Sequence, residues 1–226
     1  MEQNAGSQKI AVVGGGVAGI AAAHVLARTQ RVTLFEQAQY LGGHTNTITI
    51  TDGPDAGVAV DIRIQDYREI IGEYDRVVSI EMIEAVGRKN LSTFFDVVAR
   101  ALKPGGRFML EAISSDTLTF GTERGMDQFF LWLVTHIFPN GFLPRLDELI
   151  APCRSLFALG DVLSFGPDYD RTLMCWADNF DRHWPRLAAH YNEIFRRRWR
   201  YYLLGCAALF RMRKVQLYQI VYDKVG

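Results

Sequence analysis

The sequence predicts an α/β protein with a doubly wound, mostly parallel sheet and a helical part toward the carboxyl end. Three observations support this. Short apolar runs alternate with helical segments, a glycine-rich turn follows the first apolar run, and a Pro-Gly-Gly break separates a helix from the next strand. Hydrophobic residues make up 49% and charged residues 22% of the 226 residues, so the composition is globular and sufficient for a sizeable core.

The first strand, helix and second strand are expected at the start of the chain. Residues 9–13 form an apolar run that suits a buried parallel strand, and residues 20–27 have good helix composition. Residues 31–35 are typical of a second strand, which Glu36 ends. Between the first strand and the helix lies Gly14-Gly15-Gly16-Val17-Ala18-Gly19, a G-x-G-x-x-G pattern.

This pattern predicts a nucleotide-binding βαβ unit. Gly14 allows a tight turn, Gly16 lets a pyrophosphate approach the backbone, and Gly19 lets the helix pack closely against the strand. The free N–H groups at the start of the helix attract phosphates. Glu36 stands 22 residues after Gly14 and can accept hydrogen bonds from ribose hydroxyls. A glycine-rich turn that serves packing alone is the alternative interpretation.

The later elements follow from residue 62 onward. Residues 75–80 suit a strand, residues 91–102 a helix with an apolar face, and residues 107–113 the next strand. Lys103-Pro-Gly-Gly106 is expected to stop the helix and turn the chain. Three further elements are expected: a core helix at 126–138, amphipathic helical residues at 171–200 with a break at Pro185, and a strand at 216–222.

One hybrid strand is expected to join the two parts of the chain. Residues 57–65 alternate apolar and polar side chains. With the strands numbered by role, residues 1–61 and residues 62–226 then form one merged, Rossmann-like sheet of order 3-2-1-4-5. Residues 41–56 show no obvious helix, and residues 46–51 suit an additional hairpin strand.

Residues 8–61 also carry a second glycine motif. Leu41-Gly42-Gly43-His44-Thr45 follows the acidic residue that ends the second strand. In this order the motifs resemble the amino terminus of FAD-dependent oxidoreductases of the amine-oxidase type. The resemblance implies that Gly43 helps to bind FAD or NAD(P) together with the first motif.

Five motifs occur in order between residues 64 and 225. They are Gln65-Asp66-Tyr67-Arg68, Ser79-x-Glu81-Met82-x-Glu84-Ala85-Val86-Gly87, Ile137-Phe138-Pro139-Asn140-Gly141-x-Leu143-Pro144, Asp168-Tyr169-x-x-Thr172-Leu173-x-x-Trp176 and Trp199-x-Tyr201-Tyr202-Leu203-x-x-Cys206-x-x-x-Phe210-Arg211. Together they resemble cyclopropane-fatty-acyl-phospholipid synthases, which are S-adenosylmethionine-dependent methyltransferases. Some members of that family carry a flavin-oxidase-like region ahead of the synthase, so the chain resembles a truncated fusion joined near residue 61.

The resemblance implies a methylene transfer to the cis double bond of a phospholipid acyl chain, with S-adenosylmethionine as the donor. It implies that Glu84 and Tyr169, with a backbone group of Ile113, hold a bicarbonate ion that serves as the base. It also assigns Gln65 and Asp66 to the cofactor site, Asp66 near the adenine amino group. Purely structural roles are the alternatives: a helix-terminal carboxylate for Glu84, a core tyrosine for Tyr169 and a turn or cap for Asp66.

The chain departs from the family pattern in three ways. No acidic-x-G-x-G-x-G follows residue 61, the family's amino-terminal helical lid is missing, and Glu111 stands where many members have a histidine. Glu111 is therefore included among the predicted catalytic residues. Its carboxylate is expected to weaken the binding of bicarbonate by charge repulsion, unless Glu111 is protonated or turned away from the ion. We expect Gly14, Gly16 and Gly19 to occupy the crevice where the methyltransferase glycine loop belongs.

Three function classes therefore stay open. The first is a cyclopropane synthase-like enzyme of lipid biosynthesis that acts on unsaturated phospholipid acyl chains. The second is an FAD- or NAD(P)-binding oxidoreductase. The third is an inactive truncated fusion that binds lipid.

Charge and cysteine content bear on partners and location. The 25 basic and 25 acidic residues balance, which predicts no nucleic-acid partner. The three cysteines form no C-x-x-C and the histidines lack ligand spacing, so we expect a reducing, cytoplasmic location and no metal site. No membrane span or signal peptide is expected. Residues 190–226 carry a local charge of +6, which suits either a solvated helix face or peripheral contact with an anionic membrane. The sequence leaves the oligomeric state open.

Overall fold

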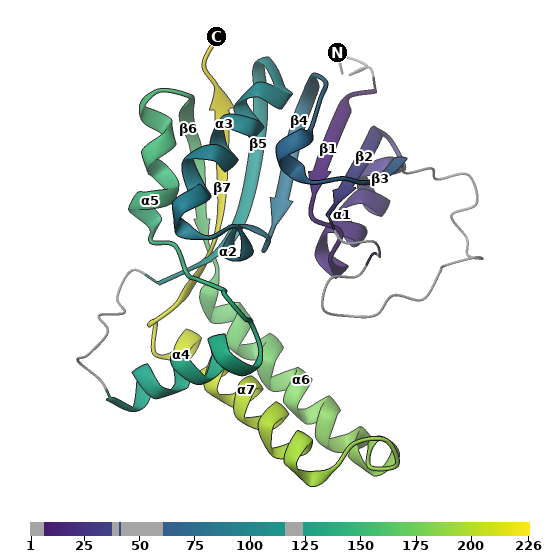
Figure 1. The fold of residues 1–226 in the computed structure, drawn as a ribbon, viewed down its shortest axis with the longest axis vertical. Coiled ribbons are helices and arrows are strands. Elements are labelled where there is room, and N and C mark those ends of the chain that lie inside the picture. Colours follow the sequence, from purple (N-terminus) through teal and green to yellow (C-terminus); the bar gives the residue numbers. More distant parts are fainter. Residues whose placement is uncertain (1–6, 38–40, 42–60, 116–123) are drawn as a thin grey trace, which may run out of the picture. The chain divides into compact units, whose positions relative to one another are not determined.

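The computed structural model describes residues 7–37, 41, 61–115 and 124–226. Its described strands form a seven-stranded sheet of order β3-β2-β1-β4-β5-β7-β6 (Figure 1). The strands are β1 (Lys9–Val13), β2 (Arg31–Glu36), β3 (Asp61–Ile64), β4 (Tyr74–Ile80), β5 (Leu102–Ser114), β6 (Phe157–Ser164) and β7 (Gln216–Lys224). The pairs β2–β3, β1–β2, β1–β4 and β4–β5 are parallel. The predicted α/β class and the order 3-2-1-4-5 are confirmed, and β7 and β6 extend the sheet beyond β5.

Helices connect these strands. The α-helices are α1 (Val17–Ala27), α2 (Ile83–Val86), α3 (Leu91–Ala101), α4 (Arg124–His136), α5 (Leu146–Ile150), α6 (Gly166–Leu187) and α7 (Glu193–Arg211). Single 3₁₀ turns are η1 (Tyr67–Glu69), η2 (Arg88–Asn90) and η3 (Ala151–Arg154). None of the helices in the described ranges is long and apolar enough to cross a membrane.

The chain divides into two compact units. Unit 1 comprises Met1–Ala112, Asp147–Val162 and Gln219–Gly226, and unit 2 comprises Ile113–Leu146 and Leu163–Tyr218. Strands β5, β6 and β7 each contribute residues to both units. The predicted division between residues 61 and 62 concerns the origin of the two segments and stays a prediction.

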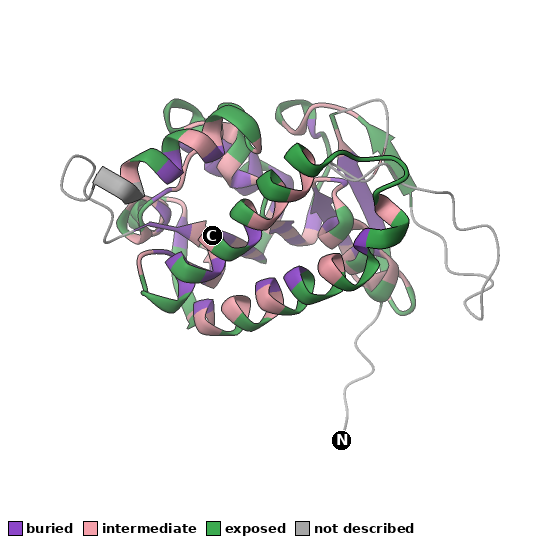
Figure 2. Ribbon diagram, turned by 90° about the horizontal axis from the view of Figure 1, so that it is seen from below, coloured by how far each residue is buried: buried purple, intermediate pink, exposed green. Residues whose placement is uncertain are grey.

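The core of unit 1 lies along the central strands. Ile10, Val12, Val32 and Leu34 are buried with Ala23 of α1, as the uninterrupted apolar runs predicted. A second group consists of aromatic rings in mutual contact: Phe94, Phe95, Phe108, Phe157 and Tyr222. Figure 2 shows the buried positions concentrated in the strands, with exposed positions on the outer faces of the helices.

The strand predicted over residues 57–65 is observed in part. Strand β3 covers Asp61–Ile64 and pairs in parallel with β2, with Ile62 next to Leu34. All four β3 residues are exposed, as befits the edge of a sheet. Residues 57–60, the crossover segment 42–56 and the predicted hairpin strand at 46–51 lie outside the described residues.

The predicted turn at Lys103-Pro-Gly-Gly106 differs from the observed structure. Strand β5 begins at Leu102, directly after α3, rather than at Arg107. Leu102 pairs with Tyr74 while Arg107 pairs with Arg76, so the four intervening residues form a bulge within the strand. Gly105 takes a φ of +68° there, which explains the glycine. The pattern could not show this because the pairing of Leu102 depends on β4.

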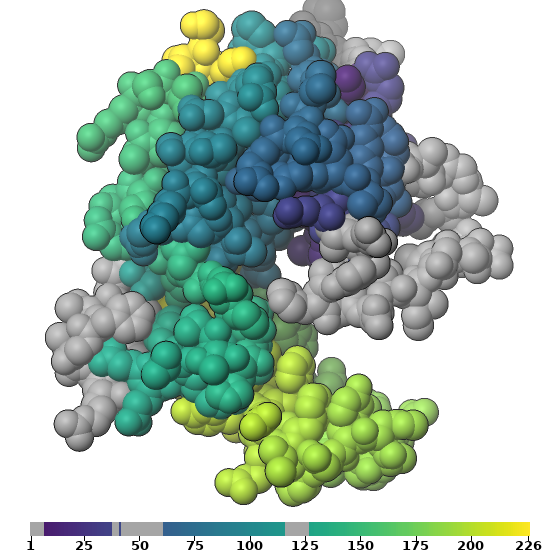
Figure 3. Space-filling view, in the orientation of Figure 1, coloured from purple at the N-terminus to yellow at the C-terminus, as the bar shows by residue number. Residues whose placement is uncertain are grey.

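Unit 2 is a helical layer built on α4, α6 and α7. The core role predicted for residues 126–138 is confirmed, because Phe129, Phe130 and Leu133 of α4 are buried in one apolar cluster with α6 and α7. Gly205 of α7 permits this packing, since a Cβ there would lie 2.3 Å from the ring of Phe129. The break predicted at Pro185 is wrong: Pro185 lies inside α6, which continues to Leu187. Proline removes one backbone N–H from a helix, and α6 ends two residues after it. In Figure 3 the yellow-green surface belongs to α6 and α7.

Candidate functional site

Three predicted cofactor-binding positions of unit 1 lie at the carboxyl ends of neighbouring parallel strands. Gly14 follows β1, Glu36 ends β2 and Gln65 follows β3. The register places Val13 next to Phe35, one residue before Gly14 and Glu36 respectively. The backbone N–H of Gln65 donates to the carbonyl oxygen of Glu36 at 2.6 Å. Ligands of doubly wound sheets bind outside this carboxyl edge, so the structure brings these positions together where a cofactor is expected.

The glycines of the first motif differ in their surroundings. Gly14 has a φ of +101° and donates its N–H to the carbonyl of Phe35 at 2.9 Å, which makes the tight turn. A Cβ on Gly16 would meet no heavy atom within 4 Å, so the space before the start of α1 is open. A Cβ on Gly19 would lie 1.9 Å from the carbonyl oxygen of Gly14. The close approach predicted for the third glycine is therefore present.

The carboxylate of Glu36 lies against this turn. Its Oε2 accepts a hydrogen bond from the backbone N–H of Gly15 at 2.7 Å. A Cβ on Gly15 would be only 2.9 Å from Oε2 of Glu36. One N–H of the turn thus already serves a fixed negative charge. This arrangement suits ligands with hydroxyl groups or positive charge better than a second anion.

Asp66 caps the turn after β3. Its Oδ1 accepts the backbone N–H of Arg68 at 2.9 Å, and its Oδ2 pairs with the guanidinium of Arg68 at 2.6 Å. These hydrogen bonds, above all those from the Arg68 side chain, lower the pKa of Asp66. The cap that the sequence left open is observed, and contact with adenine stays a prediction.

Two residues near the turn have no role in the sequence prediction. Met82 follows β4, and its Cβ and Cγ would lie 3.4 Å from a Cβ on Gly14. Ser79 is fully buried near the end of β4, and its Oγ has no hydrogen-bond partner within the described ranges. The position of both residues at the carboxyl end of β4 is the signal that could have found them. Gly43, which the second glycine motif assigned to the cofactor, lies outside the described residues.

The four predicted catalytic positions are divided between the units. Glu84 lies in the single turn of α2 directly after β4, and Glu111 lies on β5, both in unit 1. Ile113 and Tyr169 belong to unit 2, where both pack against its apolar cluster. The Tyr169 ring lies 5.1 Å from that of Phe210. These surroundings are compatible with purely structural roles as well as with catalytic roles, so the catalytic roles stay predictions.

Glu111 has a partner that the sequence did not indicate. The side-chain amide of Gln219 on β7 donates to Oε2 of Glu111 at 2.6 Å. Both residues belong to unit 1 and are 108 positions apart in the chain. The amide stabilises the negative charge of the carboxylate and holds its orientation.

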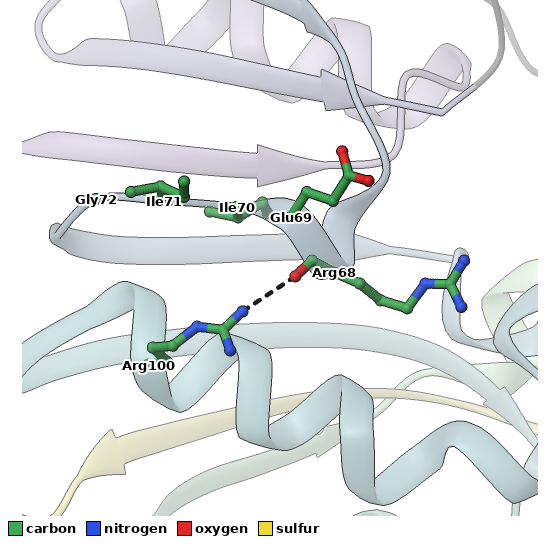
Figure 4. A pocket seen from close by; sticks show the side chains of 6 residues that line it. All are labelled: Arg68, Glu69, Ile70, Ile71, Gly72 and Arg100. Atoms are coloured by element: carbon green, nitrogen blue, oxygen red, sulfur yellow. Dashed lines mark hydrogen bonds between the residues drawn. The ribbon is translucent and has the colours of Figure 1, made fainter.

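A separate hollow of about 310 Å³ lies beside η1 in unit 1. It is lined by Arg68–Gly72 and by Arg100 of α3. Figure 4 shows Arg100 extending toward the backbone of Arg68, where its guanidinium donates to the carbonyl oxygen at 3.0 Å. None of the predicted cofactor residues lines this hollow, so we do not assign the cofactor to it. Across residues 7–37, 41, 61–115 and 124–226, no group of His, Cys, Asp or Glu is arranged to hold a metal ion.

Comparisons with known proteins extend these observations. The family model of mycolic acid cyclopropane synthetase matches residues 14–220. The cyclopropane-fatty-acyl-phospholipid synthase of Escherichia coli (strain K12) is 42% identical over 168 residues, which are 74% of this chain and 42% of that enzyme. The chain therefore spans less than half the length of this relative. Nothing in the comparisons supports a flavin-oxidase origin for residues 8–61.

Solved structures show the same fold. The cyclopropane synthase MmaA2 from Mycobacterium tuberculosis has a TM-score of 0.79 and 23% identity, with 97% of this chain and 79% of that chain covered. The mycolic acid cyclopropane synthase CmaA1 complexed with SAH and CTAB has a TM-score of 0.80, with the same identity and coverage.

Proposed function

We propose that the chain binds S-adenosylmethionine at the carboxyl ends of β1, β2 and β3. The premise is its family: the chain belongs to the mycolic acid cyclopropane synthetases. The observation that carries the proposal is the Glu36 carboxylate held against the glycine turn, 2.7 Å from the N–H of Gly15. A solved structure of the same fold, CmaA1, is a complex with SAH, which supports this choice of ligand.

The residues present fit the nucleoside half of this cofactor. Glu36 supplies acceptors for the two ribose hydroxyls, and the open space before Gly16 leaves room for the ligand to approach the backbone. Asp66, two residues after β3, is the acceptor that we assign to an adenine amino group, which would share the carboxylate with the hydrogen bonds from Arg68. The negative charge of Glu36 also favours a ligand with a positively charged sulfonium over one with a pyrophosphate.

The proposed reaction is transfer of a one-carbon unit to an unsaturated acyl chain of a phospholipid. When bound, S-adenosylmethionine supplies an electrophilic methyl group. We assign Glu84, Tyr169 and the backbone of Ile113 to an oxyanion, bicarbonate in this proposal, that takes the proton lost on ring closure. A carboxylate and a phenol can both share protons with such an ion. The motifs around these residues support the assignment.

The bond between Gln219 and Glu111 bears on this role. Many family members have a histidine at position 111, whereas this chain has a carboxylate held at 2.6 Å by an amide. In the proposal, Gln219 directs the charge of Glu111 to the amide and so limits its repulsion of the oxyanion. A cytoplasmic location and contact with an anionic membrane surface belong to the same proposal.

A dinucleotide is the second candidate ligand. The observation that favours it is Gly19, which lies so close to the turn that a Cβ there would be 1.9 Å from the carbonyl oxygen of Gly14, as expected for the third glycine of the dinucleotide fingerprint. In that case the chain would bind FAD or NAD(P) at the same turn.

Calorimetric titration separates these candidates. We expect the purified chain to bind S-adenosylhomocysteine, and Glu36→Ala to weaken binding about 10- to 100-fold because hydrogen bonds to a charged acceptor are lost. Glu73→Ala, which removes an exposed carboxylate before β4, is the matched control and should bind as the parent does. Binding of FAD or NAD(P) instead would favour the second candidate, and no binding of any of these ligands would refute both.

A further inference from the structure

Unit 2 carries a groove of about 630 Å³ on its surface. Helix α7 lines it between Glu193 and Leu204, and Trp132 of α4 completes it. Four arginines of α7 contribute to the lining, whereas Glu193 is its only carboxylate among the described residues. The groove therefore has a positive charge, although the chain as a whole is neutral.

The four arginines fall into two pairs. Arg196 and Arg200 form ion pairs with Asp181 of α6, so their charge is partly compensated. Arg197 and Arg198 are exposed, and the described part of the chain provides no ion pair or hydrogen bond to either guanidinium. Two adjacent positive charges are thus available for an external anion.

Apolar side chains share this face of α7 with the uncompensated arginines. Ile194, Tyr201 and Leu204 are 61%, 48% and 37% exposed, and their spacing of seven and three residues places them on one side of the helix. The Tyr201 ring lies 4.8 Å from the ring of Trp132, which holds it at the surface. In Figure 3 this helix forms part of the yellow-green surface.

We propose that this groove is a docking surface for an anionic phospholipid bilayer, with Arg197 and Arg198 bound to lipid phosphates. Guanidinium groups bind phosphate oxygens through paired hydrogen bonds. Aliphatic and aromatic side chains beside basic ones are typical of helices that lie at a membrane interface. A nucleic acid would be attracted by the same positive charge, but the exposed aliphatic side chains of Ile194 and Leu204 cannot form hydrogen bonds with it. The choice of lipid also rests on the proposed function, which requires access to phospholipid.

Sedimentation with vesicles tests the surface. We expect the chain to bind vesicles of phosphatidylglycerol mixed with phosphatidylcholine, and to bind pure phosphatidylcholine vesicles far more weakly. Each basic residue near an anionic surface contributes roughly 1 kcal/mol, a factor of about five, so Arg197→Gln with Arg198→Gln should lower the partition coefficient about 25-fold. The matched control is Arg182→Gln with Arg186→Gln, which removes equal charge from exposed positions of α6 outside the groove.

Fluorescence of Trp132 tests the apolar part. Its emission should shift to shorter wavelength when anionic vesicles are added, and Trp132→Phe should remove this shift. Ile194→Asn should weaken vesicle binding several-fold at unchanged charge, because an exposed apolar side chain no longer enters the interface.

Three outcomes would overturn the proposal. An equal loss of binding in the two double variants would mean a response to total charge. Binding of an RNA oligonucleotide that depends on Arg197 and Arg198, without vesicle binding, would assign the groove to nucleic acid. Absence of vesicle binding would refute it outright. Titration with S-adenosylhomocysteine in parallel tells the two proposals apart, since a chain that binds this ligand but not vesicles loses only the docking surface.

Discussion

Gly19→Ala tests the contact that holds α1 against the glycine turn. The added Cβ would lie 1.9 Å from the carbonyl oxygen of Gly14 and 3.1 Å from its carbonyl carbon. Both atoms belong to the backbone, so relief requires α1 to move away from β1, at a cost of about 3 kcal/mol. Alanine recovers about 1 kcal/mol through its higher helix propensity. We expect a net loss of about 2 kcal/mol and a melting temperature about 4–8 °C lower.

The control for this prediction is Gly16→Ala at the N-cap of the same helix. Gly16 has a φ of −69°, and its Cβ would meet nothing within 4 Å. The N-cap preference for glycine over alanine, about 1 kcal/mol, is largely offset by the lower entropy of the unfolded chain with alanine, about 0.4–1 kcal/mol, so the net change in stability should be small. Thermal unfolding followed by circular dichroism measures both variants. A Gly19→Ala protein as stable as the parent, or more stable, would show that helix propensity dominates and that the close approach is wrong.

Three other predictions concern ionisable and hydrogen-bonded groups. A hydrogen bond from Lys103 is the main cause that lowers the pKa of Asp75 below 3.8, so its stabilisation is present above about pH 4 and lost as the pH falls. The stability difference between the parent and Asp75→Asn in urea should therefore shrink below pH 4. Burial raises the pKa of Cys206 to about 12 from 9.0, so native alkylation at pH 8 should be about a thousandfold slower than in urea; comparable rates would contradict this burial. Gln219→Leu should cost about 1–2 kcal/mol in urea unfolding because Glu111 loses its donor, and unchanged stability would disprove that bond.

Local patterns predicted the elements whose burial is uniform. Strands β1 and β2 are continuous apolar runs and are buried along most of their length. Strand β6 was not predicted, and its burial explains why. Phe157 is buried, but Gly160 and the other strand residues are exposed or half-buried without alternation. The segment therefore shows neither the apolar–polar alternation of a half-buried strand nor the continuous apolar run of a fully buried one.

In the candidate site, too, features set by local sequence were predicted and contacts between distant residues were not. The tight turn at Gly14 and the close packing at Gly19 follow from spacing within one βαβ unit, so the sequence predicted both. The contact between Glu36 and the N–H of Gly15 joins residues 21 positions apart, and that between Gln219 and Glu111 joins residues 108 apart. Neither contact follows from a pattern, because each depends on which strands become neighbours.

The beginning of the chain shows that the burial of a strand and its register in the sheet depend on different features of the sequence. The alignment with the Escherichia coli synthase covers 74% of the chain, whereas the fold match to MmaA2 covers 97%. A buried parallel strand requires mainly an apolar run, which β1 provides. Its register against β4 involves particular residues, because the backbone N–H of Lys9 donates to Asp75 at 2.6 Å while Val12 pairs with Val78. The glycine turn is therefore positioned at the carboxyl edge of the sheet by contacts between β1 and β4, and the family model that matches residues 14–220 includes both the turn and β4.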